Sequence, residues 1–247
     1  MNQRQKTDGL GWLRLRLWSL HVGNYRGDWN LVSQHGETMK VLDLFCGMGG
    51  WSIGFHREGF TCYGLDEVDV GYPYELWQTP IEEFRGGEYR DMGFDVVVAS
   101  PPCTEFSILS RGLAAMGKRK PPEPEKGMAL VKEALRVIQL VQPRYWLIEN
   151  VSGAVKYFSP VMGAPKAIIK PYYLWGNFPR FLRESSYMAP KIHKMGLKNG
   201  SMLDAPGRFS PLAPWLRAKI PFPLSLGLAR ACKDRIITYS SESKPIA

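Results

Sequence analysis

The sequence contains few cysteines, and they are not arranged as metal ligands or as disulfide pairs. None of the four belongs to a CxxC pair or has a histidine partner at ligand spacing. We therefore expect neither a disulfide framework nor a metal site, and we expect a reduced intracellular setting such as the cytoplasm. The four cysteines are Cys46, Cys62, Cys103 and Cys232.

Long hydrophobic runs are also absent. No stretch of about twenty apolar residues occurs, so we expect no helix that spans a membrane. Arg14 and Arg16 interrupt the apolar run near the N-terminus, which argues against a signal peptide there. A chain of 247 residues, 45% of them hydrophobic, is long enough for one large domain, with or without a small appendage.

Acidic residues are scarce in one segment of a basic chain. The formal net charge is +9, and residues 164–219 hold ten Lys or Arg but two Asp or Glu. Tyr187, Phe209 and Trp215 are interleaved with these basic residues. Many such segments are solvated basic faces, but this excess of charge together with aromatic residues favours contact with a nucleic-acid backbone.

The run Asp95–Ala99 leads into Ser100-Pro101-Pro102-Cys103. It is short and β-branched, which predicts a buried strand of a parallel sheet, and the two prolines predict a stiff, extended exit. Ligands of open α/β sheets bind at the carboxyl ends of strands, so Cys103 is predicted to face that crevice. The alternative is a small apolar residue in a tight turn, because free cysteine packs as a hydrophobe.

A glycine-rich turn follows the earlier predicted strand Val41–Phe45 and precedes a helix-like stretch, 51–58. The next strand, Thr61–Leu65, ends in Asp66, whose carboxylate could accept hydrogen bonds from ribose hydroxyls. These two features together predict a nucleoside cofactor such as NAD or S-adenosylmethionine. Near the predicted third strand, Ile81 and Glu82 are candidates for contact with an adenine ring.

A second predicted buried strand, Tyr145–Ile148, delivers Glu149-Asn150-Val151 to the same sheet edge as Cys103. Glu149 is either a functional acid or the N-cap of a following helix. Between the two strands lies a long polar stretch, residues 104–126, which we expect to be a positively charged lid without regular structure. The pattern of residues 128–141 predicts an amphipathic helix that Pro143 ends.

Four motifs, in order, resemble those of the C5-cytosine DNA methyltransferase family. Asp43-Leu-Phe-Cys-Gly-Met-Gly-Gly50 is similar to its S-adenosylmethionine loop, and Ser100-Pro-Pro-Cys103 to its nucleophile motif. Glu149-Asn-Val151 is similar to the acid motif, and Ile220-Pro221 with Leu224-Ser225 to the final motif. The resemblance covers about residues 39–235.

The resemblance implies an α/β fold, a Rossmann-like S-adenosylmethionine-dependent methyltransferase domain with a small, irregular, basic target-recognition region. The implied division of the chain is an N-terminal extension (1–38), a core (39–176 and 220–235), a recognition region (177–219) and a polar tail (236–247). Within the core, a helix is expected over residues 224–233.

The resemblance also implies the chemistry. The thiolate of Cys103 would add to C6 of a flipped-out cytosine, Glu149 would act at N3, and S-adenosylmethionine would methylate C5. Pro102 and Asn150 are then substrate-binding residues. The cofactor-binding residues would be Asp43, Phe45, Gly47, Gly49, Gly50, Asp66 and Glu82.

The sequence departs from the family pattern in two places. The Gln-x-Arg-x-Arg motif that usually follows Glu-Asn-Val is missing, and we assign Lys170 as the donor to cytosine O2 in its place. The recognition region is short, which predicts a short or relaxed target sequence. Lys191, Lys194 and Lys198 are predicted to bind nucleic acid there.

Several alternatives remain open from the sequence. An RNA-directed member of the same family would use identical chemistry. An amino-methyltransferase would carry an aromatic residue where Cys103 stands, and a dinucleotide oxidoreductase would leave Cys103 and Glu149 without a role. A catalytically inactive nucleic-acid-binding relative is the remaining class. We expect DNA as the substrate, a restriction endonuclease as a candidate partner, and a monomer.

Overall fold

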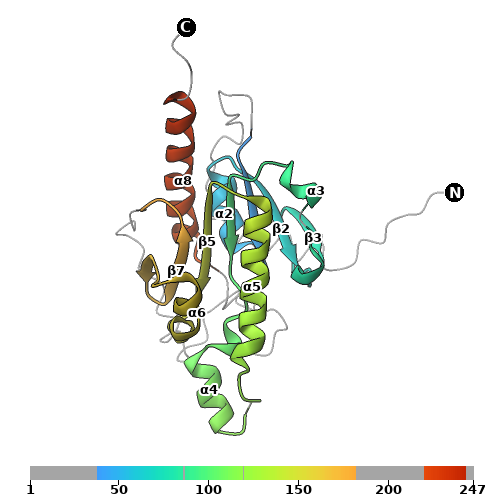
Figure 1. Cartoon of the computed structure of the whole chain (residues 1–247), viewed down its shortest axis with the longest axis vertical. Coiled ribbons are helices and arrows are strands. Elements are labelled where there is room, and N and C mark those ends of the chain that lie inside the picture. Colours follow the sequence, from blue (N-terminus) through green and yellow to red (C-terminus); the bar gives the residue numbers. More distant parts are fainter. Residues whose placement is uncertain (1–37, 86, 119, 182–219, 243–247) are drawn as a thin grey trace, which may run out of the picture.

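A computed structural model describes residues 38–85, 87–118, 120–181 and 220–242. This part of the chain contains a seven-stranded sheet with the strand order β3-β2-β1-β4-β5-β7-β6 (Figure 1). Strands β1 to β5 are parallel to their neighbours in that group, and β7 runs antiparallel to β5 and β6. The strands are β1 (Lys40–Leu44), β2 (Thr61–Asp66), β3 (Glu75–Gln78), β4 (Val96–Ala99), β5 (Tyr145–Asn150), β6 (Ala167–Ile169) and β7 (Tyr172–Asn177).

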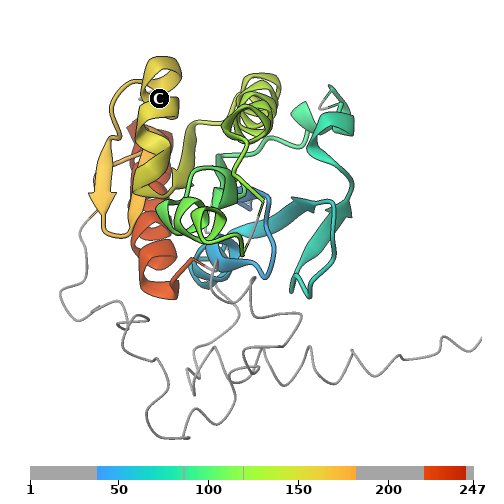
Figure 2. The ribbon, with the colours of Figure 1, turned by 90° about the horizontal axis from the view of Figure 1, so that it is seen from below.

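Helices cover both faces of the sheet. Helices α5 and α6 pack on one face and α2 and α8 on the other, which is clear when the sheet is viewed along its strands (Figure 2). The helices are α2 (Gly50–Arg57), α3 (Gly87–Arg90), α4 (Ile108–Ala115), α5 (Pro124–Val141), α6 (Val155–Met162) and α8 (Phe222–Glu242). Three single 3-10 turns are η1 (Ile81–Glu83), η2 (Cys103–Glu105) and η3 (Ser152–Ala154).

The central strands are buried on both faces, as their continuous apolar runs predict. Every residue of β4 is buried, with Val96 and Val98 in the cluster beside α2 and α8 and Val97 and Ala99 in the cluster beside α5. Such a strand has no solvated face and therefore needs no alternating polar residue. The sequence-based prediction of a buried parallel strand before Cys103 is confirmed.

The strand order reverses between β1 and β4, which are neighbours in the sheet although β2 and β3 lie between them in the chain. In open α/β sheets the ligand crevice forms at this point, outside the carboxyl ends of the strands. The α/β, Rossmann-like fold class is thereby confirmed. The same topology brings the glycine loop after β1 beside the Ser-Pro-Pro-Cys segment after β4.

The expectation of a structureless lid over residues 104–126 is wrong. The segment contains η2 and α4, and α4 projects beyond the carboxyl edge of the sheet (Figure 1). Ser107 caps α4, because its side chain accepts a hydrogen bond from the backbone N of Leu109 at 3.2 Å. Helix α5 begins at Pro124, four residues before the predicted start, and proline at a first helical position is favoured.

Two other boundaries also differ from expectation. Helix α8 runs from Phe222 to Glu242, so residues 236–242 continue the helix instead of forming a polar tail. Ile236 is buried against the cluster beside α2, which explains why the helix does not end at Lys233. A short strand, β6, was not predicted. The N-terminal extension up to residue 37, residues 182–219 of the recognition region and residues 243–247 lie outside the described residues.

In the described part of the chain, no helix combines the length and the apolar composition that crossing a membrane requires.

Candidate active site

Three chain segments leave the sheet side by side at its carboxyl edge. The strand register aligns Leu44 of β1 with Ala99 of β4, and Ala99 with Ile148 of β5. The residues that follow these three positions are Phe45, Ser100 and Glu149. The glycine loop, the Ser-Pro-Pro-Cys segment and the Glu-Asn-Val segment therefore start as neighbours, which confirms the sequence-based expectation that Glu149 and the Cys103 segment share an edge.

Glu149 is a buried carboxyl group, with 9% of its surface exposed. Burial raises its pKa from 4.5 to about 7, and a hydrogen bond from the side chain of Ser100 partly opposes that rise. Ser100 in turn accepts a hydrogen bond from the indole nitrogen Nε1 of Trp51 at 3.0 Å. A carboxyl group with such a pKa can both hold and release a proton near neutral pH.

Cys103 begins the turn η2 and is half-buried. Its carbonyl oxygen accepts hydrogen bonds from the backbone N of Phe106 at 3.1 Å and of Ser107 at 2.9 Å. None of the four cysteines forms a disulfide. The turn thus holds Cys103 in a tight backbone conformation directly after Pro102, at the end of β4.

Phe106 anchors this segment to the core. It is 1% exposed and packs edge-on against Phe158 of α6, with ring centroids 5.1 Å apart. Two glycines make room for it: a Cβ at Gly127 would lie 2.8 Å from its ring, and a Cβ at Gly153 would meet its carbonyl oxygen. The position of Cys103 is therefore fixed by packing against α5, α6 and η3 as well as by β4.

Asn150 joins the two motif segments. Its side-chain nitrogen Nδ2 donates to the carbonyl oxygen of Pro101 at 3.0 Å, and its Oδ1 accepts from the backbone N of Val151 at 2.9 Å. The side chain is 1% exposed. In the structure, the sequence-predicted substrate residue Asn150 is the hydrogen-bonded link between the Cys103 and Glu149 segments.

The glycine loop after β1 has the backbone conformation of a ligand cradle. Phe45, Gly47 and Gly49 have φ values of 57°, 48° and 71°, in the left-handed region. Asp66 at the end of β2 accepts hydrogen bonds from the backbone N of Gly47 at 2.9 Å and of Val68 at 3.2 Å. The backbone of Glu67 also hydrogen-bonds to this carboxylate. Because a carboxylate has about four acceptor sites, one remains for a ribose hydroxyl. These residues fit a nucleoside cofactor.

Two of the sequence-predicted cofactor residues support the loop from beneath. Asp43 is 1% exposed and accepts hydrogen bonds from the backbone N and the Oγ of Ser52, and burial raises its pKa to about 8. A Cβ at Gly50 would lie 2.6 Å from the backbone N of Ile220, so this glycine allows the close approach of the segment before α8. The hydroxyl of Ser225 also donates to the carbonyl of Trp51, which ties α8 to the start of α2.

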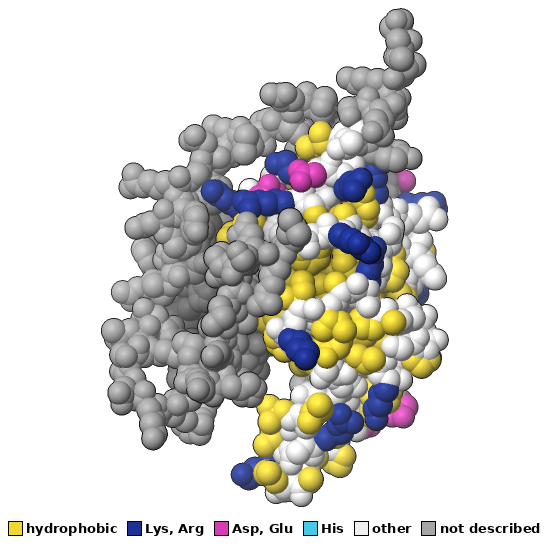
Figure 3. Space-filling view, turned by 90° about the vertical axis from the view of Figure 1, so that its left-hand side faces the viewer, with side chains coloured by type: hydrophobic (Ala, Val, Ile, Leu, Met, Phe, Trp, Pro, Cys, Tyr) yellow, Lys and Arg dark blue, Asp and Glu magenta, His cyan; other side chains and the backbone are white. Residues whose placement is uncertain are grey.

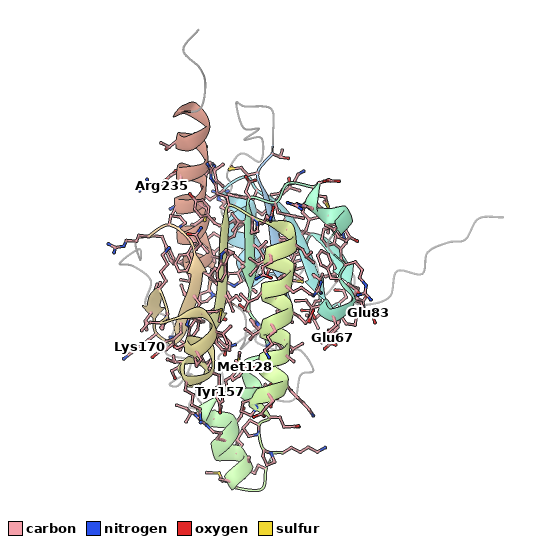
Figure 4. All side chains as sticks on the ribbon, viewed as in Figure 1. Glu67, Glu83, Met128, Tyr157, Lys170 and Arg235 are labelled. Carbon is pink, nitrogen blue, oxygen red and sulfur yellow. The ribbon has the colours of Figure 1, made fainter. Side chains whose placement is uncertain are left out.

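The remaining predicted residues differ in their surroundings. Ile81 is buried in the core and its carbonyl accepts a hydrogen bond from Arg136, whereas Glu82 is exposed on η1. Lys170 is exposed at the β6–β7 turn (Figure 4), which the pairing of Tyr173 with Asn150 places at the carboxyl edge of the sheet, beyond the end of β5. Lys191, Lys194 and Lys198 lie outside the described residues.

Two residues of the site were not singled out from the sequence. Trp51 and Ser100 both lie within quoted motif regions, but neither residue type is a typical acid, base or nucleophile. For Ser100, the alternation of side chains along the preceding strand indicates the face on which it lies. Residue 100 follows the buried pair Val98 and Ala99 and has the same side-chain parity as Val98, which places it on the face that α2 covers.

The fold and the site define a class. A Rossmann-like sheet with an antiparallel β7, a glycine loop at the reversal point and an acid at the end of β2 are the features of S-adenosylmethionine-dependent methyltransferases. Residues 39–159 match the family model of the C-5 cytosine-specific DNA methylase. This match confirms the resemblance predicted from the motifs over residues 39–159.

Individual relatives cover part of the chain. It is 30% identical over 133 residues to the type II methyltransferase M.AquIA of Picosynechococcus sp., a match covering 48% of this chain and 50% of the relative. It is 29% identical over 130 residues to the type II methyltransferase M1.HphI of Haemophilus parahaemolyticus, covering 47% and 33%. The solved structure of the Entamoeba histolytica methyltransferase EhMeth aligns with a TM-score of 0.40 and 14% identity, covering 59% and 54%. The matched region thus spans half or less of these curated relatives.

Proposed function

We propose that this chain transfers a methyl group from S-adenosylmethionine to C5 of cytosine in DNA. One observation carries the proposal: Cys103 and the buried acid Glu149 leave adjacent strands beside a glycine loop. A thiol and a carboxyl group with a pKa near neutrality, next to a nucleoside site, suit nucleophilic attack on a pyrimidine ring combined with acid–base chemistry.

Each residue has a distinct task in this reaction. The thiolate of Cys103 forms a bond to C6 of the cytosine, and electron density moves toward N3. Glu149, whose pKa is about 7, donates a hydrogen bond or a proton at N3 and so stabilises that density. S-adenosylmethionine supplies the electrophilic methyl group. Loss of the C5 proton and release of the Cys103 thiol then restore the aromatic ring.

The residues that would hold the cofactor surround the glycine loop. The remaining acceptor site of Asp66 suits a ribose hydroxyl, and the backbone of Phe45, Gly47 and Gly49 suits close approach of the ligand. Asp43 and Gly50 would act through the shape of the loop. Glu82, exposed on η1 after β3, stays our candidate for the adenine end.

The substrate base must leave the duplex to reach this site. A cytosine inside stacked DNA cannot place C6 against a half-buried thiol, so it must be flipped out. Helix α4 follows Cys103 directly and carries the exposed apolar side chains Ile108 and Leu109 beside the basic side chain of Arg111. We propose that α4 closes over the extruded base.

The test is methyl transfer to DNA and to tRNA, with tritiated S-adenosylmethionine, by the full chain. Cys103→Ser should abolish transfer, and Glu149→Gln should lower it by a factor of about 100 or more, the usual scale for a lost acid–base group. Both variants should bind S-adenosylmethionine in calorimetry almost as wild type does, because neither residue belongs to the glycine loop.

Cys232→Ala is the matched control, because Cys232 is buried in α8 away from the carboxyl edge. It should keep wild-type turnover. Retention of a tenth of wild-type turnover by Cys103→Ser would show that Cys103 is not the nucleophile. Transfer to tRNA but not to DNA would establish the RNA-directed alternative. Action inside the cell, a partner endonuclease and a monomeric state stay predictions.

A further inference from the structure

Three side chains from three separate elements form a hydrogen-bonded chain that ends on Glu149. The indole nitrogen of Trp51 in α2 donates to Oγ of Ser100 at 3.0 Å, and the Ser100 side chain bonds to the Glu149 carboxyl. An indole N–H is a donor only, and a serine hydroxyl has one hydrogen. Because Trp51 occupies a lone pair of Ser100, the serine hydrogen is directed toward Glu149.

The two ends of this chain of bonds are buried, and Ser100 between them is half-buried. Trp51 is 1% exposed and Glu149 is 9% exposed, and Trp51 belongs to the apolar cluster beside α2 and α8. Hydrogen bonds shielded from water hold their geometry better and polarise one another. The backbone of Trp51 is itself held, because its carbonyl accepts the hydroxyl of Ser225 from α8.

We propose that Trp51 and Ser100 are positioning residues that orient the Glu149 carboxyl at the sheet edge and stabilise its ionised form. The inference rests on the proposed function, in which Glu149 acts on the base. Neither residue touches the substrate in this assignment.

The other side chains around Glu149 do not account for the rise of its pKa. On the same face of the sheet, β1 contributes Asp43 and β7 contributes Tyr172, and the segment after β4 contributes Cys103. Helix α2 contributes Trp51 and Ser52, and α8 packs on this face through apolar side chains. Burial and the Ser100 hydrogen bond are the causes of the Glu149 pKa shift, and no charged neighbour is among them.

The assignment predicts the sign of each substitution. The Ser100 bond stabilises the carboxylate, so Ser100→Ala should raise the pKa of Glu149 above its value of about 7. A lost hydrogen bond to a charged group corresponds to a shift of about one pKa unit. Trp51→Phe should shift the pKa in the same direction by less, since it removes only the polarisation of the serine hydroxyl.

The experiment is a pH titration of the glutamate side-chain carbonyl carbons by ¹³C NMR, on the full chain without substrate. Glu149→Gln identifies the Glu149 signal by its disappearance. Trp175→Phe is the matched control, because the Trp175 indole is equally buried but donates to the carbonyl of Gly163 at 3.1 Å. Its titration of Glu149 should match wild type. Ser100→Thr keeps the hydroxyl and should restore the wild-type midpoint.

The pH profile of methyl transfer provides a second readout. If the protonated Glu149 is the active form, the alkaline limb should move to higher pH in Ser100→Ala and Trp51→Phe. An unchanged NMR midpoint in Ser100→Ala, or an equal shift in Trp175→Phe, would overturn the assignment. If Ser100→Ala does not fold, the NMR midpoints of Glu149 in Trp51→Phe and Trp175→Phe are compared instead. Equal midpoints in these two variants would overturn the assignment.

Failure of the proposed function would look different. Full activity of Glu149→Gln would remove Glu149 from the chemistry, whatever the NMR midpoints are. An inactive Glu149→Gln with unmoved midpoints in the Ser100 and Trp51 variants would leave the function intact and refute only the positioning role.

Discussion

Among the buried carboxyl groups of the described residues, Asp43 and Glu149 have the most strongly raised pKa values. Burial raises their pKa values to about 8 and about 7. The carboxyl group of Asp43 accepts hydrogen bonds from Ser52 beneath the glycine loop, so it stabilises the conformation of the loop. Glu149 lies where β5 ends, next to the Cys103 segment. Asp43 is therefore a structural acid and Glu149 the candidate functional acid, and this difference follows from their positions in the sheet.

Glu149 should make the protein less stable as pH rises. Its folded pKa of about 7 lies above the ordinary 4.5, so the folded state binds the proton more tightly. Its contribution is fully present below about pH 4.5 and is lost as pH rises through about 7. Glu149→Gln should therefore be more stable than wild type at pH 8, by on the order of 3 kcal/mol at most, and this difference should shrink toward pH 5. Thermal melts across that range measure it.

The control for this experiment is Glu67→Gln. Glu67 is exposed directly after β2, at the edge of the molecule in Figure 4, so its replacement should leave the melting temperature close to that of wild type. A pH-independent difference between wild type and Glu149→Gln would mean that Glu149 is not desolvated. A gain of stability on losing a candidate functional acid is the expected trade-off at an active site.

At the scale of elements, the packing of α2 against α8 sets the position of Trp51 and of the glycine loop. Gly54 is the point of closest approach, because a Cβ there would lie 2.5 Å from the backbone N of Leu226. Gly54→Ala should therefore destabilise the fold by about 1–3 kcal/mol, the scale of overpacking, although alanine is the better helix former. The measurement is the midpoint of urea unfolding.

Gly112→Ala is the comparison within another helix. Nothing lies within 4 Å of a Cβ built on Gly112, which is in α4. Here only the helix propensity changes, so the substitution should be neutral or stabilising by up to about 1 kcal/mol. Equal effects of the two substitutions would show that the α2–α8 contact is looser than the structure has it.

At the scale of the whole molecule, charge is distributed unevenly. On the face shown in Figure 3, Lys and Arg side chains are more frequent than Asp and Glu and lie among hydrophobic side chains. The segment 164–219, with ten basic and two acidic residues, supplies +8 of the chain's net charge of +9. A molecule of this charge is expected to bind nucleic acid in a salt-dependent way.

Alanine at Lys191, Lys194 and Lys198 should weaken that salt dependence. Each phosphate contact contributes a slope of about −0.9 to the logarithm of affinity against the logarithm of salt concentration on duplex DNA. The triple variant should lose roughly one unit of slope per contact made, in fluorescence anisotropy with a labelled duplex. S-adenosylmethionine affinity is the internal control and should not change. An unchanged slope would move the nucleic-acid contact elsewhere, with Lys118 and Lys120 beside α4 as the next candidates.

Local sequence was sufficient for the central strands, the glycine loop and the pairing of Cys103 with Glu149. Buried parallel strands are marked by continuous apolar runs, and their carboxyl ends meet at one edge whatever the details of the fold. The helix α4 and the true length of α8 were not predicted. The position of α4 follows from Phe106 just before it, which packs in the core, and the length of α8 follows from Ile236, which packs on the α2 side. Local composition does not encode such contacts.

The tertiary structure decided which residues meet. Trp51, Ser100 and Glu149 are separated by 49 residues at each step, and only the order β1-β4-β5 and the packing of α2 bring them into one hydrogen-bonded chain. The sequence determined by itself that a thiol and an acid lie at strand ends. It could not determine the proton affinity of that acid, because burial and the Ser100 hydrogen bond arise only when three distant segments pack together.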